Sequence, residues 1–354
     1  MHYTTAGESH GRCLIAILEG IPSGLKIDDS FINIDLQRRQ SGYGRGNRME
    51  IETDRIEILA GVKNEITIGS PLALKIENRD FTLDSLNEIN VPRPGHSDLA
   101  GAIKYRQGIR VVSERASARE TAAKVAVGAV CKLLLKEFNI EILSWTLSIG
   151  KIKIKFSPQL SNLLPSKKTL LSSQLNCPDT EAEDLMLAEL DKASQEGNSL
   201  GGVVEIAVAN LPVGLGSYVD CRKRLDSCLS QALMSIPSVK GVEIGLGFKS
   251  SQCFGSEVQD EIYYNSEQKR FYRKTNNAGG LEGGMTNGEP LVLRFALKPI
   301  PTLKKPLRSV DIISKKEAKA AVERADTCVV PAAGVVGETV IAFELAKVMQ
   351  EKFP

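Results

Sequence analysis

The order of apolar and polar residues along the chain predicts both strands and helices. Residues 12–21 are apolar and lead into a Pro-Ser-Gly turn, which is typical of a strand or a short helix. Residues 49–58 alternate apolar and charged side chains, and residues 66–76 are again rich in apolar ones. Because alternation with a period of two places apolar side chains on one face of a strand, we expect these two segments to pair. Residues 35–48 are polar and rich in Gly and Arg, which favours a surface loop, or a short helix followed by a loop.

Three segments carry clear start or stop signals of helices. The clearest begins at Ser117, where Ser-Ala-Arg-Glu fits a capping box and small apolar residues then recur at helical spacing. A second helix is expected over 220–236, since its apolar residues share one face and Pro237 ends it. Ser314 opens another capping box, which predicts a helix to about residue 325.

The chain shows no boundary between domains. Glycine-rich stretches at 197–202 and 279–284 each precede an alternating, strand-like segment, which is weak support for an internal duplication. Residues 151–196 contain a serine-rich stretch and an acidic helix, and we interpret them as a peripheral excursion. No Pro-, Ser- or Gly-rich linker divides the sequence, so we expect one domain over residues 1–354. Its fold class should be α+β, with helices and antiparallel sheets in layers.

Composition narrows the function classes. Of 354 residues, 42% are hydrophobic and 25% charged, which is ordinary for a globular protein with a core. A net charge of +2 gives no global field that would attract nucleic acid or an anionic membrane. Seven scattered cysteines without a C-x-x-C pair, together with only three histidines, predict neither a disulfide framework nor a metal site. No export signal or membrane-length apolar stretch is evident, so we expect a cytoplasmic protein.

Two of the three histidines stand in glycine-bearing turns. His10 lies in Gly-Glu-Ser-His-Gly, beside Ser9, and His96 follows Arg-Pro-Gly. An imidazole can donate or accept a proton near neutral pH, so both are candidate catalytic groups. The third, His2, is expected at a frayed end.

A serine-hydrolase interpretation of the G-x-S-x-G pattern around Ser9 must be weighed. The nucleophile elbow of such enzymes joins a central strand to a helix, and only six residues precede Gly7. The hydrolase order also requires a catalytic histidine late in the chain, and none follows His96. We therefore do not favour a hydrolase.

Arginines accompany these histidines. Arg115 and Arg119 flank the predicted helix start at Ser117, where free N–H groups attract anions. Arg39 and Arg45 lie in the glycine-bearing segment, and a guanidinium can form two parallel bonds to a phosphate. Neither a P-loop nor a Rossmann glycine pattern is present, so an NTPase or dinucleotide dehydrogenase is not indicated.

Eight sequence blocks together resemble the chorismate synthase family. They are GESHG at 7–11, RRQSGYGRGNRM at 38–49, RPGHSD at 93–98, RASARET at 115–121, SIPSVKGVEIG at 235–245, NNAGGLEGGMTNGE at 276–289, KPIPT at 298–302 and RADTCVVPAAGVVGE at 324–338. Each block is modest alone, but all eight in the family's order make a specific match.

The resemblance implies a reaction and a cofactor. In this family 5-enolpyruvylshikimate 3-phosphate loses phosphate and a ring proton by anti-1,4-elimination to give chorismate, the last step of the shikimate pathway to aromatic amino acids. The reaction requires reduced FMN without net redox change. Members are usually homotetramers whose subunits hold helices between antiparallel sheets. The compact length favours the type that relies on an external flavin reductase, with NADPH as an indirect reductant.

The resemblance also implies residue roles. His10 becomes the candidate acid toward the leaving phosphate, and His96 the candidate donor to the N1/O2 edge of the flavin. Asp326 with Ser9 resembles the relay that serves flavin N5. Expected substrate contacts come from five arginines, namely Arg39, Arg45, Arg93, Arg119 and Arg324. Expected FMN contacts are Arg115, Ala116, Ser117, Pro237, Ser238, Gly283, Lys298, Pro299, Ile300, Pro301, Thr302 and Arg324, and nicotinamide nucleotide binding is attributed to Arg39 and Arg45.

The sequence leaves one non-enzymatic function to be considered. A flavin- or metabolite-binding protein would need the pocket but no turnover. The proton-transfer set of Ser9, His10, His96 and Asp326 argues against it, because binding alone requires no such groups.

Overall fold

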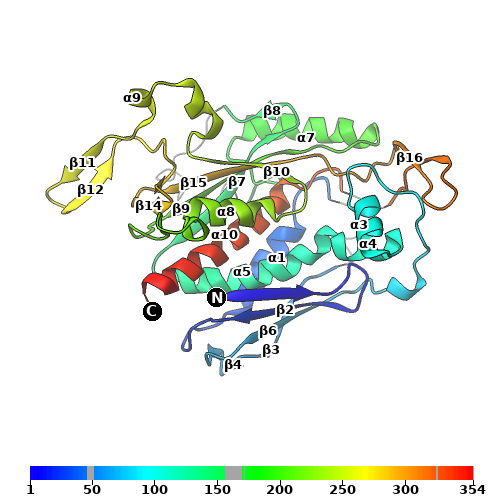
Figure 1. Ribbon diagram of the computed structural model, residues 1–354, viewed down its shortest axis with the longest axis horizontal. Helices are drawn as coiled ribbons and strands as arrows, with labels where there is room; N and C mark the ends of the chain where they lie inside the picture. The colour runs from blue at the N-terminus through cyan, green and yellow to red at the C-terminus, as the bar shows by residue number, and fades with distance from the viewer. Residues whose placement is uncertain (46–51, 156–169, 171, 324–325, 354) are drawn as a thin grey trace.

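The computed structural model describes residues 1–45, 52–155, 170, 172–323 and 326–353. Three layers are visible in Figure 1, with helices lying between two antiparallel sheets. The layered α+β prediction is therefore confirmed.

The first sheet has four strands in the order β1-β2-β6-β3. Its strands are β1 (His2–Ala6), β2 (Cys13–Glu19), β6 (Leu72–Glu77) and β3 (Ile56–Ala60). The predicted pairing of the two alternating segments is confirmed, since Ile56 lies opposite Ile76 in the β3–β6 ladder. A short hairpin of β4 (Val62–Lys63) and β5 (Ile66–Thr67) connects them. His2, expected at a frayed end, instead belongs to strand β1 and pairs with Glu19.

The second sheet has five strands in the order β10-β15-β9-β7-β8. Its strands are β10 (Val239–Ile244), β15 (Leu291–Leu297), β9 (Gly202–Ala209), β7 (Glu141–Ile149) and β8 (Ile152–Lys153). The two strands that follow the glycine-rich stretches, β9 and β15, are direct antiparallel neighbours.

Among the described residues, the middle layer is formed by α1 (Asp29–Gln40), α5 (Thr121–Lys136), α8 (Leu225–Met234) and α10 (Val330–Lys352). α5 packs against α10 on one side and against β2 and β6 on the other, while α10 also contacts β7 and β9. The two helices approach closely at Gly128, where a Cβ would come within 2.3 Å of Thr339. A continuous buried apolar cluster joins both sheets through this layer.

Helix α10 was not predicted from the sequence. Nearly all of its residues from Val330 to Met349 are buried, so apolar side chains occur on every side and leave no amphipathic stripe. The sequence predicted a surface loop, or a short helix followed by a loop, over residues 35–48. Helix α1 begins six residues earlier, at Asp29. Of that segment, Asp35 and Arg39 are buried rather than at the surface.

The two other predicted helices begin later than expected, α5 at Thr121 instead of Ser117 and α8 at Leu225 instead of residue 220. Ser117 Oγ accepts from the Arg119 amide, but the Glu120 carboxylate pairs with Lys124 instead of reaching back, so only half the capping box forms. A 3₁₀ turn, η2 (Ala118–Glu120), precedes α5, and another, η3 (Cys221–Lys223), precedes α8.

The helix predicted from Ser314 is wrong. The segment forms a hairpin of β16 (Arg308–Val310) and β17 (Glu317–Lys319). Asp311 accepts hydrogen bonds from the amides of Ile313 and Ser314, and this side-chain turn competes with a helix start.

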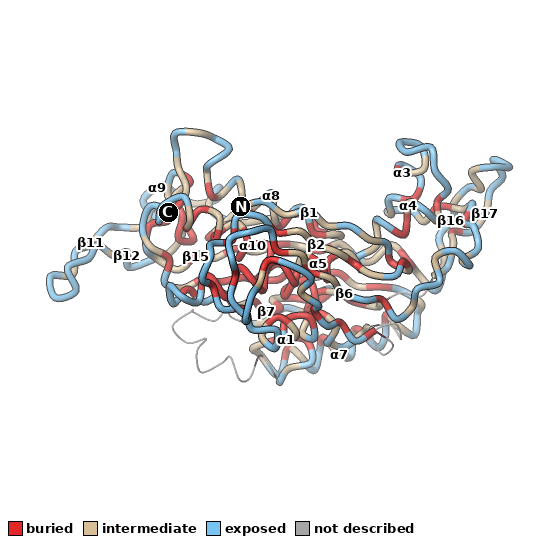
Figure 2. The backbone as a smooth tube through the Cα atoms, turned by 90° about the horizontal axis from the view of Figure 1, so that it is seen from below, coloured by how far each residue is buried: buried red, intermediate tan, exposed pale blue. Residues whose placement is uncertain are grey.

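Smaller elements surround the three layers. They are α3 (Asp98–Tyr105), α4 (Ile109–Ala116), the acidic helix α7 (Thr180–Gln195), α9 (Gly255–Val258), the 3₁₀ turns η1 (Leu83–Ser85) and η4 (Gly247–Gln252), and the hairpins β11 (Ile262–Asn265)–β12 (Arg270–Arg273) and β13 (Leu281–Glu282)–β14 (Met285–Thr286). Figure 2 shows the β11–β12 and β16–β17 hairpins as exposed projections at opposite ends. Across the described ranges, no helix combines the length and apolar character required to cross a membrane.

Candidate active site

A cavity of about 700 Å³ opens where segments from most of the chain meet. Its walls come from the β1–β2 turn, the α3–α4 region, the start of α5, the segment after α8, the segment after β15 and the start of α10. This volume is in the range of small-molecule and cofactor sites. Both singled-out histidines, His10 and His96, line it.

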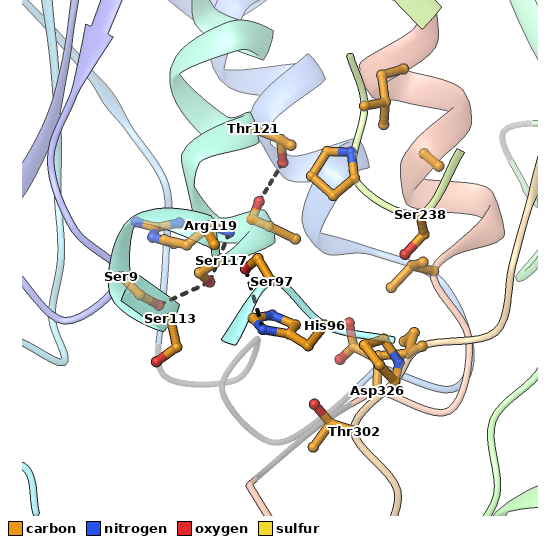
Figure 3. Close-up of a pocket in the computed structure, with 18 of the residues that line it drawn as sticks. Ser9, His96, Ser97, Ser113, Ser117, Arg119, Thr121, Ser238, Thr302 and Asp326 are labelled. Atoms are coloured by element: carbon orange, nitrogen blue, oxygen red, sulfur yellow. Dashed lines mark hydrogen bonds between the residues drawn. The ribbon is translucent and has the colours of Figure 1, made fainter. Parts of the chain in front are cut away.

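The turn that carries His10 is held on several sides. Gly7 has φ +111°, and a Cβ there would lie 2.4 Å from the Cys13 carbonyl, so only glycine fits. The side-chain amide of Asn78 donates to the backbone carbonyl of Gly11 at 2.7 Å. The backbone N–H of Ser9 donates to the backbone carbonyl of Glu114 at 3.0 Å. The turn joins two strands, unlike a hydrolase elbow, and Ser9 Oγ bonds to Ser117 Oγ at 3.1 Å (Figure 3).

The His10 imidazole contacts a buried carboxylate. Its Nδ1 lies 2.9 Å from Glu114 Oε1, and its Nε2 lies 3.8 Å from Asp80 Oδ2. The same Glu114 side chain accepts from the His10 backbone amide at 2.7 Å. Burial would raise the pKa of Glu114, but the hydrogen bonds from His10 outweigh it and lower that pKa.

His96 lies inside the cavity in Figure 3, and it also contacts a carboxylate. Its Nδ1 is 2.5 Å from Asp98 Oδ1 and 3.2 Å from Arg93 Nη2. Burial opposes ionisation of Asp98, yet hydrogen bonds from His96 and Arg93 hold its pKa far below the usual range. Arg93 also bonds Thr302 Oγ1 at 3.1 Å, so its guanidinium organises the site around His96.

Two buried guanidinium groups, those of Arg39 and Arg119, line the cavity. Asp54 accepts from Arg39 at 2.7 Å and from Arg119 at 2.6 Å. Burial lowers the pKa of Arg39, and the neighbouring charges of Arg119 and Arg45 lower it further, against the opposite effect of Asp54. Arg39 Nε is buried and has no hydrogen-bond partner among the residues that the structure describes. An anionic ligand would relieve this concentration of positive charge.

The cavity as a whole is cationic. Among the described lining residues, seven cations face three carboxylates, namely Arg39, Arg45, Arg93, Arg110, Arg119, Lys240 and Lys298 against Glu114, Glu323 and Asp326. Lys298 Nζ donates to the Gly95 carbonyl at 2.8 Å, and partial burial, with Lys240 nearby, lowers its pKa.

The part of the cavity wall formed by the segment after α8 and by the start of α10 is mostly apolar. It is built from Ile236, Pro237, Val239, Val329, Ala332, Ala333 and Val336, with Ser238 among them.

Asp326 and Ser9 occupy separate parts of the site. Asp326 forms an ion pair with Arg45 at 2.8 Å, whereas Ser9 bonds Ser117. Figure 3 shows the two side chains on opposite sides of the cavity, so a relay between them would have to cross it.

Most predicted site residues are brought together. The cavity is lined by Ser9, His10, Arg39, Arg45, Arg93, His96, Ala116, Ser117, Arg119, Pro237, Ser238, Lys298, Ile300, Pro301, Thr302 and Asp326. Arg324 lies outside the described residues.

Three predicted cofactor contacts do not line this cavity. Arg115 is turned away, donating to the Thr5 carbonyl at 3.1 Å and Thr5 Oγ1 at 2.9 Å. Pro299 is exposed, although its neighbours Lys298 and Ile300 line the cavity. Gly283 lies in the β13–β14 turn with φ +58°.

Sequence reasoning missed the carboxylates that hold the imidazoles and guanidiniums. Glu114, Asp98 and Asp54 lie among many acidic residues, and only their burial distinguishes them. A buried charge requires a partner of opposite charge. For Asp98 that partner is Arg93, and the only sign of the pair in the sequence is that both residues lie in one short motif.

A cavity that holds two imidazoles among several cations is typical of an enzyme that acts on a small molecule. Comparison with known proteins makes this specific. The family model described as Chorismate synthase matches residues 1–350. The chain therefore belongs to the chorismate synthase family, and it is a carbon–oxygen lyase acting on a phosphate.

Individual relatives agree over nearly the whole length. The chain is 52% identical over 366 aligned positions to the chorismate synthase of Desulforamulus reducens, covering 100% of this chain and 94% of the relative. It is 51% identical to that of Caldicellulosiruptor bescii, with 99% and 95% covered. A crystal structure of chorismate synthase superimposes with a TM-score of 0.82 at 42% identity, covering 99% of this chain and 92% of the other.

Proposed function

We propose that this enzyme converts 5-enolpyruvylshikimate 3-phosphate to chorismate and phosphate by anti-1,4-elimination, with reduced FMN as cofactor. The supporting observation is that His10 and His96 open onto one cavity in which cations outnumber carboxylates. The substrate carries two carboxylates and a phosphate, and such a cavity matches its charge.

The residues present fit FMN. The buried, unpartnered Nε of Arg39 and the apolar wall around Pro237 are what an anionic cofactor with a flat ring requires. Ala116, Ser117, Pro237 and Ser238 would contact the ring, and Lys298 and Thr302 would hold the phosphate. When bound, reduced FMN would supply transient electron density to the substrate.

The chain's own residues would supply charge and protons. As the C–O bond to phosphate breaks, Arg39, Arg45 and Arg119 stabilise the charge that develops on the leaving group. His10 donates a proton toward that phosphate, and His96 would donate a hydrogen bond to the cofactor while keeping its proton. The electron pair of the broken C–H bond forms one double bond, the existing ring double bond shifts by one position, and the C–O pair leaves with the phosphate, so atoms and electrons balance without net redox change. Asp326, paired with Arg45, is the carboxylate available to take up the released proton.

The proposal includes the wider setting of the enzyme. We infer a homotetramer in the cytoplasm that receives reduced flavin from an external reductase, with NADPH as an indirect reductant. The apolar side chains exposed on the β11–β12 hairpin support assembly, because an isolated two-stranded hairpin is only marginally stable in water.

The deciding experiment is anaerobic phosphate release from 5-enolpyruvylshikimate 3-phosphate, measured with and without reduced FMN. Stoichiometric chorismate and phosphate are expected only when reduced FMN is present. Release without FMN, or none with it, would contradict the proposal. A metabolite-binding protein would show ligand affinity but no phosphate release.

A further inference from the structure

We propose that Glu114 is a positioning residue for His10, fixing its proton on Nδ1 so that Nε2 is the proton-transfer atom. This inference deepens the proposed function and rests on it for its kinetic consequence. Its structural part, the location of the imidazole proton, can be measured without any activity.

The first support is the geometry of the Glu114 carboxylate. Oε1 lies 2.9 Å from His10 Nδ1, and Oε2 lies 2.7 Å from the His10 backbone nitrogen. Both oxygens are thus directed at one residue, across 104 positions in sequence. The backbone bond fixes the carboxylate, and the carboxylate then fixes the plane of the ring.

The second support is the charge of the carboxylate. Glu114 is 4% exposed, and a buried carboxylate that keeps its charge needs donors. Its donors are the two His10 nitrogens, with Arg110 contributing at longer range, and together they lower the pKa of Glu114 against the effect of burial. An ionised carboxylate only accepts hydrogen bonds, so the ring must donate Nδ1–H.

The consequence concerns the other ring nitrogen. With Nδ1–H committed to Glu114, Nε2 is the nitrogen that gains or gives up a proton. Asp80 Oδ2 lies 3.8 Å from Nε2, so a second carboxylate faces the other ring nitrogen. Glu114 and Asp80 thus lie one on each side of the imidazole that is to act as an acid toward the leaving phosphate.

The second imidazole is held differently. The Asp98 carboxylate is shared between His96 and the Arg93 guanidinium, which bonds it through Nε at 2.8 Å and Nη2 at 3.0 Å. Arg93 therefore balances much of the Asp98 charge. Glu114 has no such direct cation partner among the hydrogen bonds and ion pairs of the described residues, so its charge acts mainly on His10.

Glu114→Gln tests the inference because it keeps the shape of the side chain. The backbone amide of His10 still needs an acceptor, so the Gln oxygen faces it and the Gln NH₂ group faces Nδ1. Nδ1 must then accept, and the proton moves to Nε2. Glu120→Gln is the matched control, since it removes a nearby carboxylate that pairs with Lys124 outside the cavity.

The direct readout is the ¹⁵N spectrum of the histidine rings. The chain has three histidines, and His10→Ala assigns one set of signals. We expect Nδ1 of His10 to carry a proton in the wild-type protein and in Glu120→Gln, and to lose it in Glu114→Gln. A bare Nδ1 in the wild-type protein overturns the inference, as does an unchanged His10 signal in Glu114→Gln. If Glu114→Gln does not fold, the wild-type spectrum still decides.

Kinetics supply the second readout. We expect Glu114→Gln to lower kcat about 100-fold, the lower end of what a positioned proton donor contributes, with little change in KM. Wild-type kcat in a variant whose proton has moved would overturn the positioning role. If the wild-type enzyme itself releases no phosphate, the proposed function fails while the ring spectra still test the contact with Glu114.

Discussion

Arg45 and Asp326, 281 positions apart, form an ion pair of 2.8 Å at the edge of the cavity. Their side chains are 11% and 19% exposed, so the pair can be reached by a ligand and is only partly screened by water. The pairing connects a predicted substrate contact to a predicted proton acceptor.

Arg45→Ala should raise the substrate KM by about 10- to 100-fold, the loss of one charge-assisted hydrogen bond. Removing the guanidinium also leaves Asp326 without this cation, so kcat should fall as well. Steady-state phosphate release measures both constants. Unchanged KM and kcat would count against a place for Arg45 in the substrate site.

His10→Ala and His96→Ala should each reduce turnover by about 10²- to 10⁴-fold, the range for a general acid or base. His2→Ala is the matched control, because His2 is exposed in strand β1. His2→Ala should unfold at the wild-type temperature, whereas His10→Ala and His96→Ala should stay folded but be less stable, because each leaves a buried carboxylate without one of its donors. A near wild-type rate in either cavity variant would reject the role assigned to that histidine.

Lys298→Ala should weaken FMN binding, because a cation near the expected phosphate is lost. Lys304→Ala, an exposed lysine six residues away, should bind normally. Quenching of flavin fluorescence measures both affinities. Since the pKa of Lys298 is lowered by burial, wild-type binding should weaken as pH rises toward 10, before an ordinary lysine would lose its charge. Equal affinities in the two variants would remove Lys298 from the site.

Glu338→Gln should destabilise the fold by about 3–5 kcal/mol, because Glu338 is the buried partner of two cations. It accepts from Arg38 at 2.8 Å through both oxygens and from Lys132 at 2.6 Å. Glu317→Gln, which breaks an exposed pair with Arg308, should change stability by less than about 1 kcal/mol. Urea unfolding measures both.

The same carboxyl gives a pH dependence with a definite sign. Burial would raise the pKa of Glu338, but Arg38 and Lys132 lower it far below its unfolded value. Its stabilising contribution is therefore complete above about pH 4.3 and is lost as pH falls further. The acid-induced loss of stability should be shallower in Glu338→Gln. Parallel pH curves for the two proteins would contradict this assignment.

Phe271→Asp on the β11–β12 hairpin should reduce the assembly below four subunits. Phe271 lies opposite Tyr264, and both side chains are more than half exposed. Leu185→Asp on α7 changes another exposed apolar residue and serves as the comparison. Sedimentation velocity measures the mass. A monomeric wild-type protein would refute the tetramer, and a tetrameric Phe271→Asp variant would place the interface elsewhere.

The sequence by itself determined the chemistry-bearing motifs and much of the secondary structure. His10 and His96 could be recognised as candidate catalytic residues from the sequence. They are two of only three histidines, and each stands next to a glycine. The β3–β6 pair and helix α5 followed from periodicity, which depends only on which face of an element is buried.

Tertiary structure alone decided what those motifs contact. Helix α10 left no periodic signal, because it is buried on all sides between α5 and the second sheet. The hairpin at 308–319 formed where a capping box was expected, since the Asp311 side chain bonds the backbone locally. The partnership of His10 with Glu114 joins residues 104 positions apart, and no local pattern can encode a contact made by folding.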